Sequence, residues 1–481
     1  MNKIINFLYK KITKDKITLF IIFTIIIILF ITFISYIVIR IIKRIKRKNI
    51  YVGCLYSEFG LLQEASIDNY KILIESFNYA IKENNCNIKI IPIYKNLKDN
   101  LSEFPKWVEE CVKKYNIKYF FGCWRSSERE SIKSILKKYN LKLFYPLQYE
   151  GSEALKNIYY FGSCPNQQII PGLKYFFDTF YYYNDIYIIG SDYSYPQISI
   201  IMIKNYIEKF HKDKKIIFSK LYSLEETDFS EFIEILFKKS PNGAIIINLI
   251  NGKSYYSYSK QIYEYYNKVF GNINESIFNS QIKVINYLKN PSLEINIKLN
   301  QRYPSITTSI VENDLIKNDI KYIYGNYFAF NFSNEVIINP IYHLTEGYEN
   351  ADKDLKFLKN FIKKQNKPIG DAQYSTFLSA LFFIKTLKII LDKKENIYDP
   401  DIYDKYKKIT FNSVTGNHSF LENNHITKNF FVLQCNTDGI FDIKYQSFNN
   451  IEPMPFIFLA NKIFDTDSNK QNIYLSNRIY N

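Results

Sequence analysis

The sequence predicts an α/β protein in which parallel, doubly wound sheets are divided between at least two lobes. The first observation behind this prediction is periodicity. Short apolar runs alternate along the chain with amphipathic helical segments, which is typical of strands joined by crossover helices. The second observation is length. With 481 residues, the chain is longer than a single ordinary hydrophobic core requires, so two lobes are the expected minimum.

Three loops in the middle of the chain each follow a predicted strand and are rich in small, aromatic and hydroxyl residues. They read GCWRSS at 122–127, PLQYEG at 146–151 and GSDYSYP at 190–196. Ligands of doubly wound sheets bind beyond the carboxyl ends of the strands. We therefore expect these three loops to form the functional site.

The other predicted elements continue the same alternation. Before the central loops, strands are predicted at 50–56 and 88–93, followed by helices at 65–83 and 105–115. After them, strands are predicted at 216–222, 244–248 and 304–306, and helices at 197–212, 351–364 and 374–391. An Asn- and Lys-rich stretch at 267–301 is predicted to be a surface insertion.

The N-terminal region predicts a membrane anchor. A nearly unbroken apolar run from Ile17 to Ile39 is long enough to cross the hydrocarbon core as a helix. A basic flank precedes it at 1–16 and a basic linker follows at 40–49, where a cleavable signal would end in small residues. We therefore expect one uncleaved transmembrane helix at 17–39. The charges on its two sides balance, so they do not indicate an orientation.

Composition and motifs argue against several classes of function. The formal net charge of +16 would suit nucleic acid, but lysine is spread along the chain without a recognition helix, an RNP-type aromatic pair or zinc spacing, so no nucleic-acid partner is expected. The six cysteines form no C-x-x-C pair, which argues against a metal or redox site and leaves disulfides possible. No nucleophile elbow, metalloprotease or dinucleotide motif occurs, so we expect no enzyme and no cofactor.

Four segments, in this order, resemble a known family. They read GCWRSSER at 122–129, FYPLQYEG at 144–151, FGSCPNQQIIP at 161–171 and GSDYSYP at 190–196. Together they are similar to the urea and short-chain-amide substrate-binding proteins of ABC transporters, which have the type I periplasmic-binding-protein fold. The resemblance extends from Tyr51 to Tyr445.

This resemblance implies two Rossmann-like lobes joined by a hinge. Lobe 1 is expected to comprise 50–160 and 305–412, lobe 2 to comprise 161–304 and 413–449, and 450–481 is a tail without an assignment. The chain is expected to cross between the lobes at 157–165 and 307–312. A late strand at 411–416 is expected to return it to lobe 2.

The resemblance also implies a set of ligand contacts. A site for urea or an amide needs hydrogen-bond donors, acceptors and a flat apolar wall. The residues at the matching positions are Trp124, Ser126, Tyr149, Tyr193, Tyr195, Asn251, Ser309 and Asp371. In a chain with 43 tyrosines, packing is the competing role for each aromatic residue. Arg129 and Glu150 are expected to be structural partners on the rim.

The predicted function is that of a membrane-anchored solute-binding protein that closes on urea, a short-chain amide or a similar small polar solute. The resemblance implies a binding domain outside the cytosol and an ABC permease or a signalling protein as partner. Departures from the family pattern at Leu61, Lys253 and Tyr374 leave open a different ligand or a site that no longer binds one. Two alternatives remain: a receptor ectodomain of the same fold, and a type II membrane-anchored glycosyltransferase with the triplet at 465–467.

Overall fold

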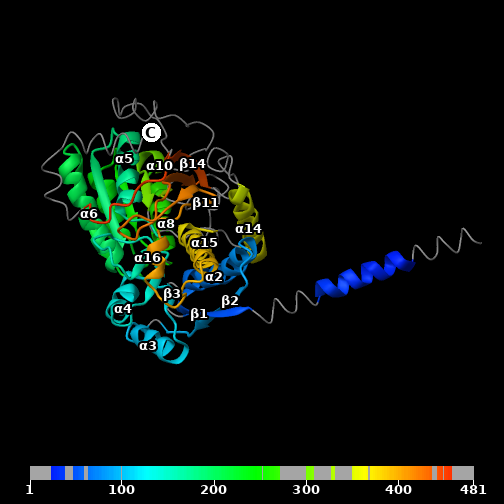
Figure 1. The fold of residues 1–481 in the computed structure, drawn as a ribbon. Coiled ribbons are helices and arrows are strands. Elements are labelled where there is room, and N and C mark those ends of the chain that lie inside the picture. Colours follow the sequence, from blue (N-terminus) through cyan, green and yellow to red (C-terminus); the bar gives the residue numbers. More distant parts are fainter. Residues whose placement is uncertain are drawn as a thin grey trace, which may run out of the picture.

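Five strands form the first sheet of the computed structural model, and seven strands form the second (Figure 1). The structure describes residues 23–37, 47–58, 63–98, 100–251, 253–270, 299–307, 327–330, 349–366, 369–435, 441–447 and 449–457, and the structural statements below concern these residues. Helices cover both sheets, so each sheet is the centre of one α/β lobe. This two-lobed, doubly wound architecture confirms the predicted fold class.

The first sheet is entirely parallel and has the strand order β2-β1-β3-β4-β5. Its strands are β1 (Lys48–Leu55), β2 (Ile88–Tyr94), β3 (Tyr119–Gly122), β4 (Lys142–Tyr145) and β5 (Ile158–Tyr160). Every residue of β3 and β4 is buried, as expected for central parallel strands with helices on both faces.

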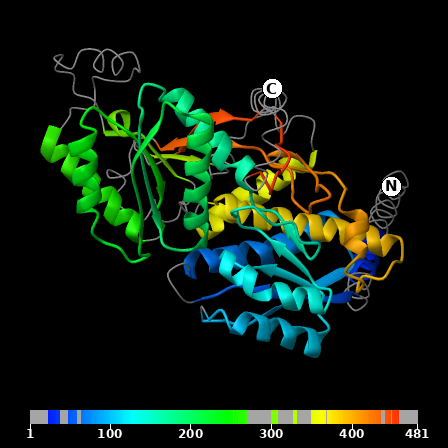
Figure 2. The same ribbon diagram turned by 90° about the vertical axis from the view of Figure 1, so that its left-hand side faces the viewer.

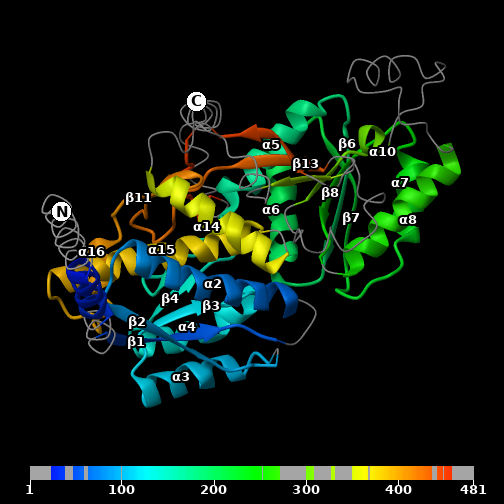
Figure 3. The ribbon, with the colours of Figure 1, turned by 90° about the vertical axis from the view of Figure 1, so that its right-hand side faces the viewer.

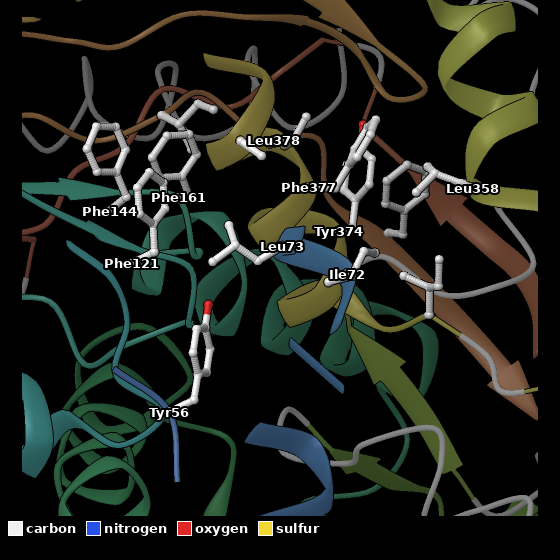
Figure 4. Packing of buried hydrophobic residues seen from close by; sticks show 14 of the residues in the cluster. Tyr56, Ile72, Leu73, Phe121, Phe144, Phe161, Leu358, Tyr374, Phe377 and Leu378 are labelled. Atoms are coloured by element: carbon white, nitrogen blue, oxygen red, sulfur yellow. The ribbon is translucent and has the colours of Figure 1, made fainter. Parts of the chain in front are cut away.

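Two pairs of helices cover the faces of this sheet. One pair is α2 (Gln63–Glu83) with α15 (Asp371–Asp392), and the other is α3 (Glu103–Tyr115) with α4 (Ser126–Lys138) (Figure 3). Successive side chains of a strand point to opposite faces. Phe121 therefore points into the α2–α15 layer (Figure 4), where its ring centre lies 5.2 Å from that of Phe383 of α15. Phe120 instead belongs to the apolar cluster that contains Trp107 of α3.

The second sheet has the order β14-β13-β10-β9-β8-β6-β7. Its strands are β6 (Asp185–Ser191), β7 (Lys215–Tyr222), β8 (Ile245–Leu249), β9 (Ser305–Thr307), β10 (Tyr327–Phe330), β13 (Phe431–Cys435) and β14 (Phe441–Gln446). The first five are parallel, β13 pairs antiparallel with β10, and β14 pairs antiparallel with β13. One face packs against α5 (Ile169–Thr179) and α6 (Ser194–Phe210), and the other against α7 (Ser230–Lys239) and α8 (Lys253–Phe270).

Several further elements complete the two lobes. Figure 2 shows the lobes from another side, with the first sheet in blue and cyan and strands β6 to β8 in green. The further elements are the 3-10 helix η1 (Pro165–Gln167), α10 (Leu299–Arg302), α14 (Glu349–Gln365), α16 (Ile402–Tyr406) and the hairpin strands β11 (Phe411–Ser413) and β12 (Gly416–His418). Part of the unassigned tail also packs on the lobes. The backbone of Ile451 bridges to Lys428, and the carbonyl oxygen of Pro455 accepts a hydrogen bond from the N–H of Ser152 (2.6 Å).

Two predicted lobe boundaries are wrong. The prediction places lobe 1 from residue 305 onward, but β9 and β10 pair with each other and β9 pairs with β8, so both strands belong to lobe 2. The prediction also places the return to lobe 2 at 411–416, whereas β11 pairs with β12 in a hairpin and β13 makes the return. Strands of three or four residues, such as β9, β10 and β11, are too short for their local sequence to specify a pairing partner, which is why local sequence could not place them.

The N-terminal helix covers only part of the predicted anchor. Residues 23–37 are helical, and large apolar side chains along them are exposed, for example Phe23 and Leu29. The remainder of the predicted run at 17–39 lies outside the described residues. A second helix, α15, meets the length and hydropathy of a membrane span, but 72% of its apolar window is buried in the protein, so it is a core helix.

The cysteines do not form disulfides where their side chains are described. Cys54, Cys86, Cys111, Cys123 and Cys164 are free and buried. Burial raises the pKa of the Cys111 thiol to about 12 and that of Cys86 to about 11. Such thiols are protonated at neutral pH and therefore act as small apolar groups in the cores.

Helix α14 is tied to α2 by one buried hydrogen bond, which gives a first testable prediction. Tyr79 of α2 donates to Asp354 Oδ1 at 2.6 Å, and Asp354 is only 4% exposed. Tyr79→Phe removes the donor and leaves a buried carboxyl group without it, so we expect a loss of about 1–3 kcal/mol in the free energy of unfolding. Urea unfolding measures this loss. Tyr181→Phe, at a site that is 60% exposed, is the control and should change stability by less than about 0.5 kcal/mol.

Candidate functional site

The turn between β3 and α4 presents the first group of candidate residues. Gly122 has a φ of +116°, and a Cβ at this position would lie 2.4 Å from the carbonyl oxygen of Leu55. Both features require glycine. The N–H of Cys123 then donates to the same oxygen at 2.8 Å. The turn places Trp124, partly buried, and Ser126, buried, at the carboxyl edge of the first sheet.

Glu128 closes this turn from inside α4. Its Oε2 accepts hydrogen bonds from the backbone N–H groups of Trp124 (2.6 Å) and Arg125 (3.1 Å), and its Oε1 accepts one from Arg125 Nε (3.1 Å). Burial raises the pKa of Glu128, and Arg125 opposes that increase. Glu128 is not among the site residues predicted from the sequence. A Glu at the third position of a helix, which caps open N–H groups, is the signal that could have identified it.

A buried network joins the loops after β3 and β4. Ser126 Oγ donates to Glu150 Oε2 at 2.8 Å. Arg129 forms ion pairs with Glu150 (3.7 Å) and with Glu153 (3.2 Å), and its side chain is only 1% exposed. Arg129 and Glu150 are therefore partners, as predicted, but the prediction that they lie on the rim is wrong. Buried charges persist only when they are paired, and these are.

The guanidinium group of Arg129 lies between two tyrosine rings. It is 4.8 Å from the centre of the Tyr145 ring and 4.9 Å from that of Tyr149. Burial alone would lower the pKa of Arg129, but Tyr145, Glu153 and Glu150 together outweigh burial and raise it. The cation thus remains charged and fixes the loop that carries Glu150.

Tyr149 belongs to the crossing between the lobes, which corrects its prediction as a ligand contact. Its hydroxyl donates to the carbonyl oxygen of Glu153 (2.8 Å) and also contacts His425 Nε2 (2.5 Å). Its ring stacks on Tyr160, with ring centres 5.0 Å apart. A buried hydroxyl with two protein partners has a packing role. Local sequence could not reveal this role, because Tyr149 and His425 are 276 positions apart.

Asp371 is also placed differently from the prediction. Lys428 Nζ donates to both of its carboxylate oxygens, at 2.8 and 2.9 Å, and to Ser375 Oγ at 2.8 Å. Lys428 is itself buried. The pair fastens the crossing segment before β13 to the first turn of α15. We therefore assign Asp371 to this ion pair and not to ligand contact.

The second lobe contributes the loops after β6 and β8. Asn251 Nδ2 donates to the Tyr193 hydroxyl at 2.7 Å, and the Asn251 N–H donates to Ser191 Oγ at 2.9 Å. Tyr195, the second residue of α6, is buried and donates to Gln168 Oε1 at 3.2 Å. Tyr195 thus supports the loop from behind, whereas Tyr193 and Asn251 form its edge.

The edges of the two lobes lie near each other. Helices α4 and α6, which begin at these edges, are in contact. Burial is the main cause that raises the pKa of Tyr193, and Tyr195, Tyr145 and Glu150 raise it further. Tyr145 and Glu150 belong to the first lobe, so the Tyr193 hydroxyl lies within their electrostatic range. The structure therefore brings Trp124 and Ser126 to one edge and Tyr193 and Asn251 to the facing edge, and Ser309 lies outside the described residues.

Metal binding has no support among the described residues. Within the described ranges, no group of three or more His, Cys, Asp and Glu side chains could hold a metal ion. The site consists of hydroxyl, carboxylate and amide groups together with aromatic rings. Such groups bind a small polar molecule by hydrogen bonds and stacking.

Comparisons with known proteins agree with this geometry. A family model described as "Periplasmic binding protein domain" matches residues 50–462, which is most of the chain. That match is to a binding domain and not to an enzyme, as the sequence predicts.

Several solved structures are similar in fold. An amino acid ABC transporter substrate-binding protein from Pseudomonas fluorescens is 12% identical with a TM-score of 0.64, and the match covers 85% of this chain and 98% of that one. A branched-chain amino acid transporter substrate-binding protein from Streptococcus pneumoniae, in complex with isoleucine, is 13% identical with a TM-score of 0.59, covering 84% and 100%. A solute-binding protein from Rhodopseudomonas palustris, in complex with p-hydroxybenzoic acid, is 16% identical with a TM-score of 0.59, covering 85% and 97%.

Proposed function

Because the chain belongs to the periplasmic binding protein domain family, we propose that it is a solute-binding protein of an ABC transporter that closes its two lobes on a small polar molecule. The proposed ligand is urea, a short-chain amide or a chemically similar solute. Its binding between the lobes favours the closed state by the difference in its affinity for the closed and open forms.

One observation carries this proposal. Loops at the carboxyl ends of strands in both sheets carry polar side chains, with Ser126 and Glu150 on the first lobe and Tyr193 and Asn251 on the second. Helices α4 and α6, which begin at two of these loops, are in contact. A ligand that bonds to both edges links the lobes. Trp124 supplies an aromatic surface beside Ser126. This is the position at which doubly wound sheets bind their ligands.

We further propose that the apolar helix anchors the binding domain to a membrane. The support is the exposed apolar surface of 23–37 and the length of the surrounding run at 17–39. The binding domain then lies outside the cytosol, and an ABC permease that recognises the closed form is the proposed partner. The triplet at 465–467, on which the glycosyltransferase alternative rests, lies outside the described residues and beyond the family match.

Thermal unfolding of the full chain in detergent micelles tests the ligand. Urea, acetamide and formamide are compared with amino acids and sugars as negative probes. A ligand present at a hundred times its Kd should stabilise the fold by about 2.7 kcal/mol. Trp124→Ala should abolish this stabilisation, because the aromatic wall of the site is lost. Tyr181→Ala, which changes an exposed aromatic residue after α5, should preserve it.

Two results would count against the proposal. If none of the amides stabilises the protein, the proposed ligand class is wrong. If an amide stabilises Trp124→Ala as strongly as the parent chain, the solute binds somewhere other than between these edges.

A further inference from the structure

The two edges of the site differ in the hydrogen-bonding groups that they offer: the first lobe offers acceptors, and the second lobe offers a donor. On the first lobe, the hydroxyl hydrogen of Ser126 is directed to Glu150 Oε2 (2.8 Å), and Ser126 Oγ accepts a hydrogen bond from Arg129 Nη1 (3.4 Å). Toward a ligand, Ser126 therefore offers its remaining lone pair. Glu150 offers carboxylate lone pairs as well. Both groups are buried acceptors at the same point. This edge therefore suits a ligand group that carries N–H donors.

The backbone donors that begin α4 do not change this polarity. Helix starts expose N–H groups that attract anions. Here the N–H groups of Trp124 and Arg125 already donate to Glu128 Oε2. Glu128 thus accepts the hydrogen bonds that these two N–H groups would otherwise donate to a ligand carboxylate.

The basic side chains of this region are also committed to protein carboxylates. Arg125 pairs with Glu128 at 3.1 Å, and Arg129 pairs with both Glu150 and Glu153. Lys133 contacts Glu130 and Glu153. Each of these three cations therefore already has a protein carboxylate as its partner. An incoming anion would meet the buried carboxyl groups of Glu128 and Glu150 without an uncommitted cation to pair with.

The second lobe has the opposite polarity. Tyr193 accepts a hydrogen bond from Asn251 Nδ2 (2.7 Å), which leaves its own O–H hydrogen to donate. Among the described contacts, no acceptor takes that hydrogen. A ligand carbonyl oxygen could receive it. An amide carries N–H donors at one end and a carbonyl acceptor at the other, which matches both edges at once.

We propose that Glu128 and Glu150 are specificity-determining residues that make this site select uncharged N–H donors, such as amides, and exclude carboxylates. This inference rests on the proposed function and deepens it. It distinguishes the chain from the solved structures of similar fold that hold isoleucine or p-hydroxybenzoic acid, both of which carry a carboxylate.

The test uses pairs of probes that differ only in this group. Acetamide is compared with acetate, and benzamide with benzoate, by isothermal titration of the full chain in detergent micelles. Because a like-charge contact in a buried site costs several kcal/mol, the amide of at least one pair should bind about a hundredfold more tightly than its acid. Glu150→Gln and Glu128→Gln should each reduce that ratio by about tenfold or more.

Glu130→Gln is the matched control. Glu130 lies on the same helix and bonds to Arg129 and Lys133, but its side chain is 51% exposed. Its replacement removes one negative charge without touching the two edges. The amide-to-acid ratio should therefore stay within about twofold of that of the parent chain, since exposed charges are largely screened.

The outcomes separate this inference from the proposed function. Binding of the acid as tightly as the amide overturns the inference and leaves the solute-binding function intact. An unchanged ratio in both Gln variants overturns the roles of Glu128 and Glu150. If no amide, acid or urea binds, the proposed function is rejected and the inference with it. If Glu150→Gln does not fold, the parent ratio and Glu128→Gln still decide.

Discussion

Arg129→Met is expected to lower the free energy of unfolding by about 3–5 kcal/mol, because it leaves Glu150 buried without its cation and Glu153 with Lys133 alone. The guanidinium group also makes cation–π contacts with the rings of Tyr145 and Tyr149, and these contacts are lost with it. Urea unfolding of the full chain, followed by circular dichroism, measures the change.

Two further variants make the reason for this loss testable. Adding Glu150→Gln to Arg129→Met removes the carboxylate that has lost its cation and should recover part of the stability. Lys138→Met, on the same helix but 63% exposed, should cost no more than about 0.5 kcal/mol. A loss below about 1 kcal/mol for Arg129→Met would mean that the buried carboxyl groups become protonated or reach water when the cation is removed.

Acidification from pH 6.5 to pH 4 is expected to destabilise the protein through two buried histidines. Burial lowers the pKa of His418 and of His425 to about 4 in the folded protein. An unfolded histidine titrates near pH 6.5, so between these values the unfolded chain binds protons that the folded chain does not. The contribution of the two histidines to stability is therefore constant above about pH 6.5 and falls as the pH decreases toward 4. Each histidine contributes a loss of about 3 kcal/mol.

A buried aspartate contributes with the opposite sign over part of the same range. Burial raises the pKa of Asp354 to about 7, so the folded state holds a proton that the unfolded state releases near pH 4. Its stabilising effect is present at low pH and is lost as the pH rises through 7. This roughly offsets one histidine. The net expectation remains a loss of stability on acidification.

Unfolding free energies from urea titrations at pH 4, 5, 6, 7 and 8 measure this profile. His418→Gln and His425→Gln should each flatten it, and Asp354→Asn should make it steeper. His211 is a useful comparison because it is only partly buried, so His211→Gln should alter the profile least. A profile that is unchanged in both single histidine variants would contradict the buried, neutral state of these rings.

Local pattern was sufficient for many elements of the fold. The predicted strand at 88–93 corresponds to β2 (Ile88–Tyr94), and the predicted helix at 65–83 corresponds to α2 (Gln63–Glu83). Both carry a strong hydrophobic period, and that period depends on residues close together in the chain. The loops that bring Trp124, Ser126 and Tyr193 to the ends of strands were predictable for the same reason.

Which polar side chains and which strands pair with each other could be decided only from the folded structure. Asp371 and Tyr149 carry the residue types of a ligand site, yet Lys428 and His425 occupy their polar atoms. The assignment of β9 and β10 to the second sheet likewise depends on partners elsewhere in the sequence.

The sequence by itself determined the alternation of strands and helices, the two-lobed fold class and the turns at which a ligand site forms. The tertiary structure alone decided which side chains at those turns remain available to a ligand. The physical reason is that hydrophobic periodicity depends on residues that are close together in the sequence. The pairing of buried charges and hydroxyls depends instead on residues that are far apart in the sequence and meet only in the folded protein.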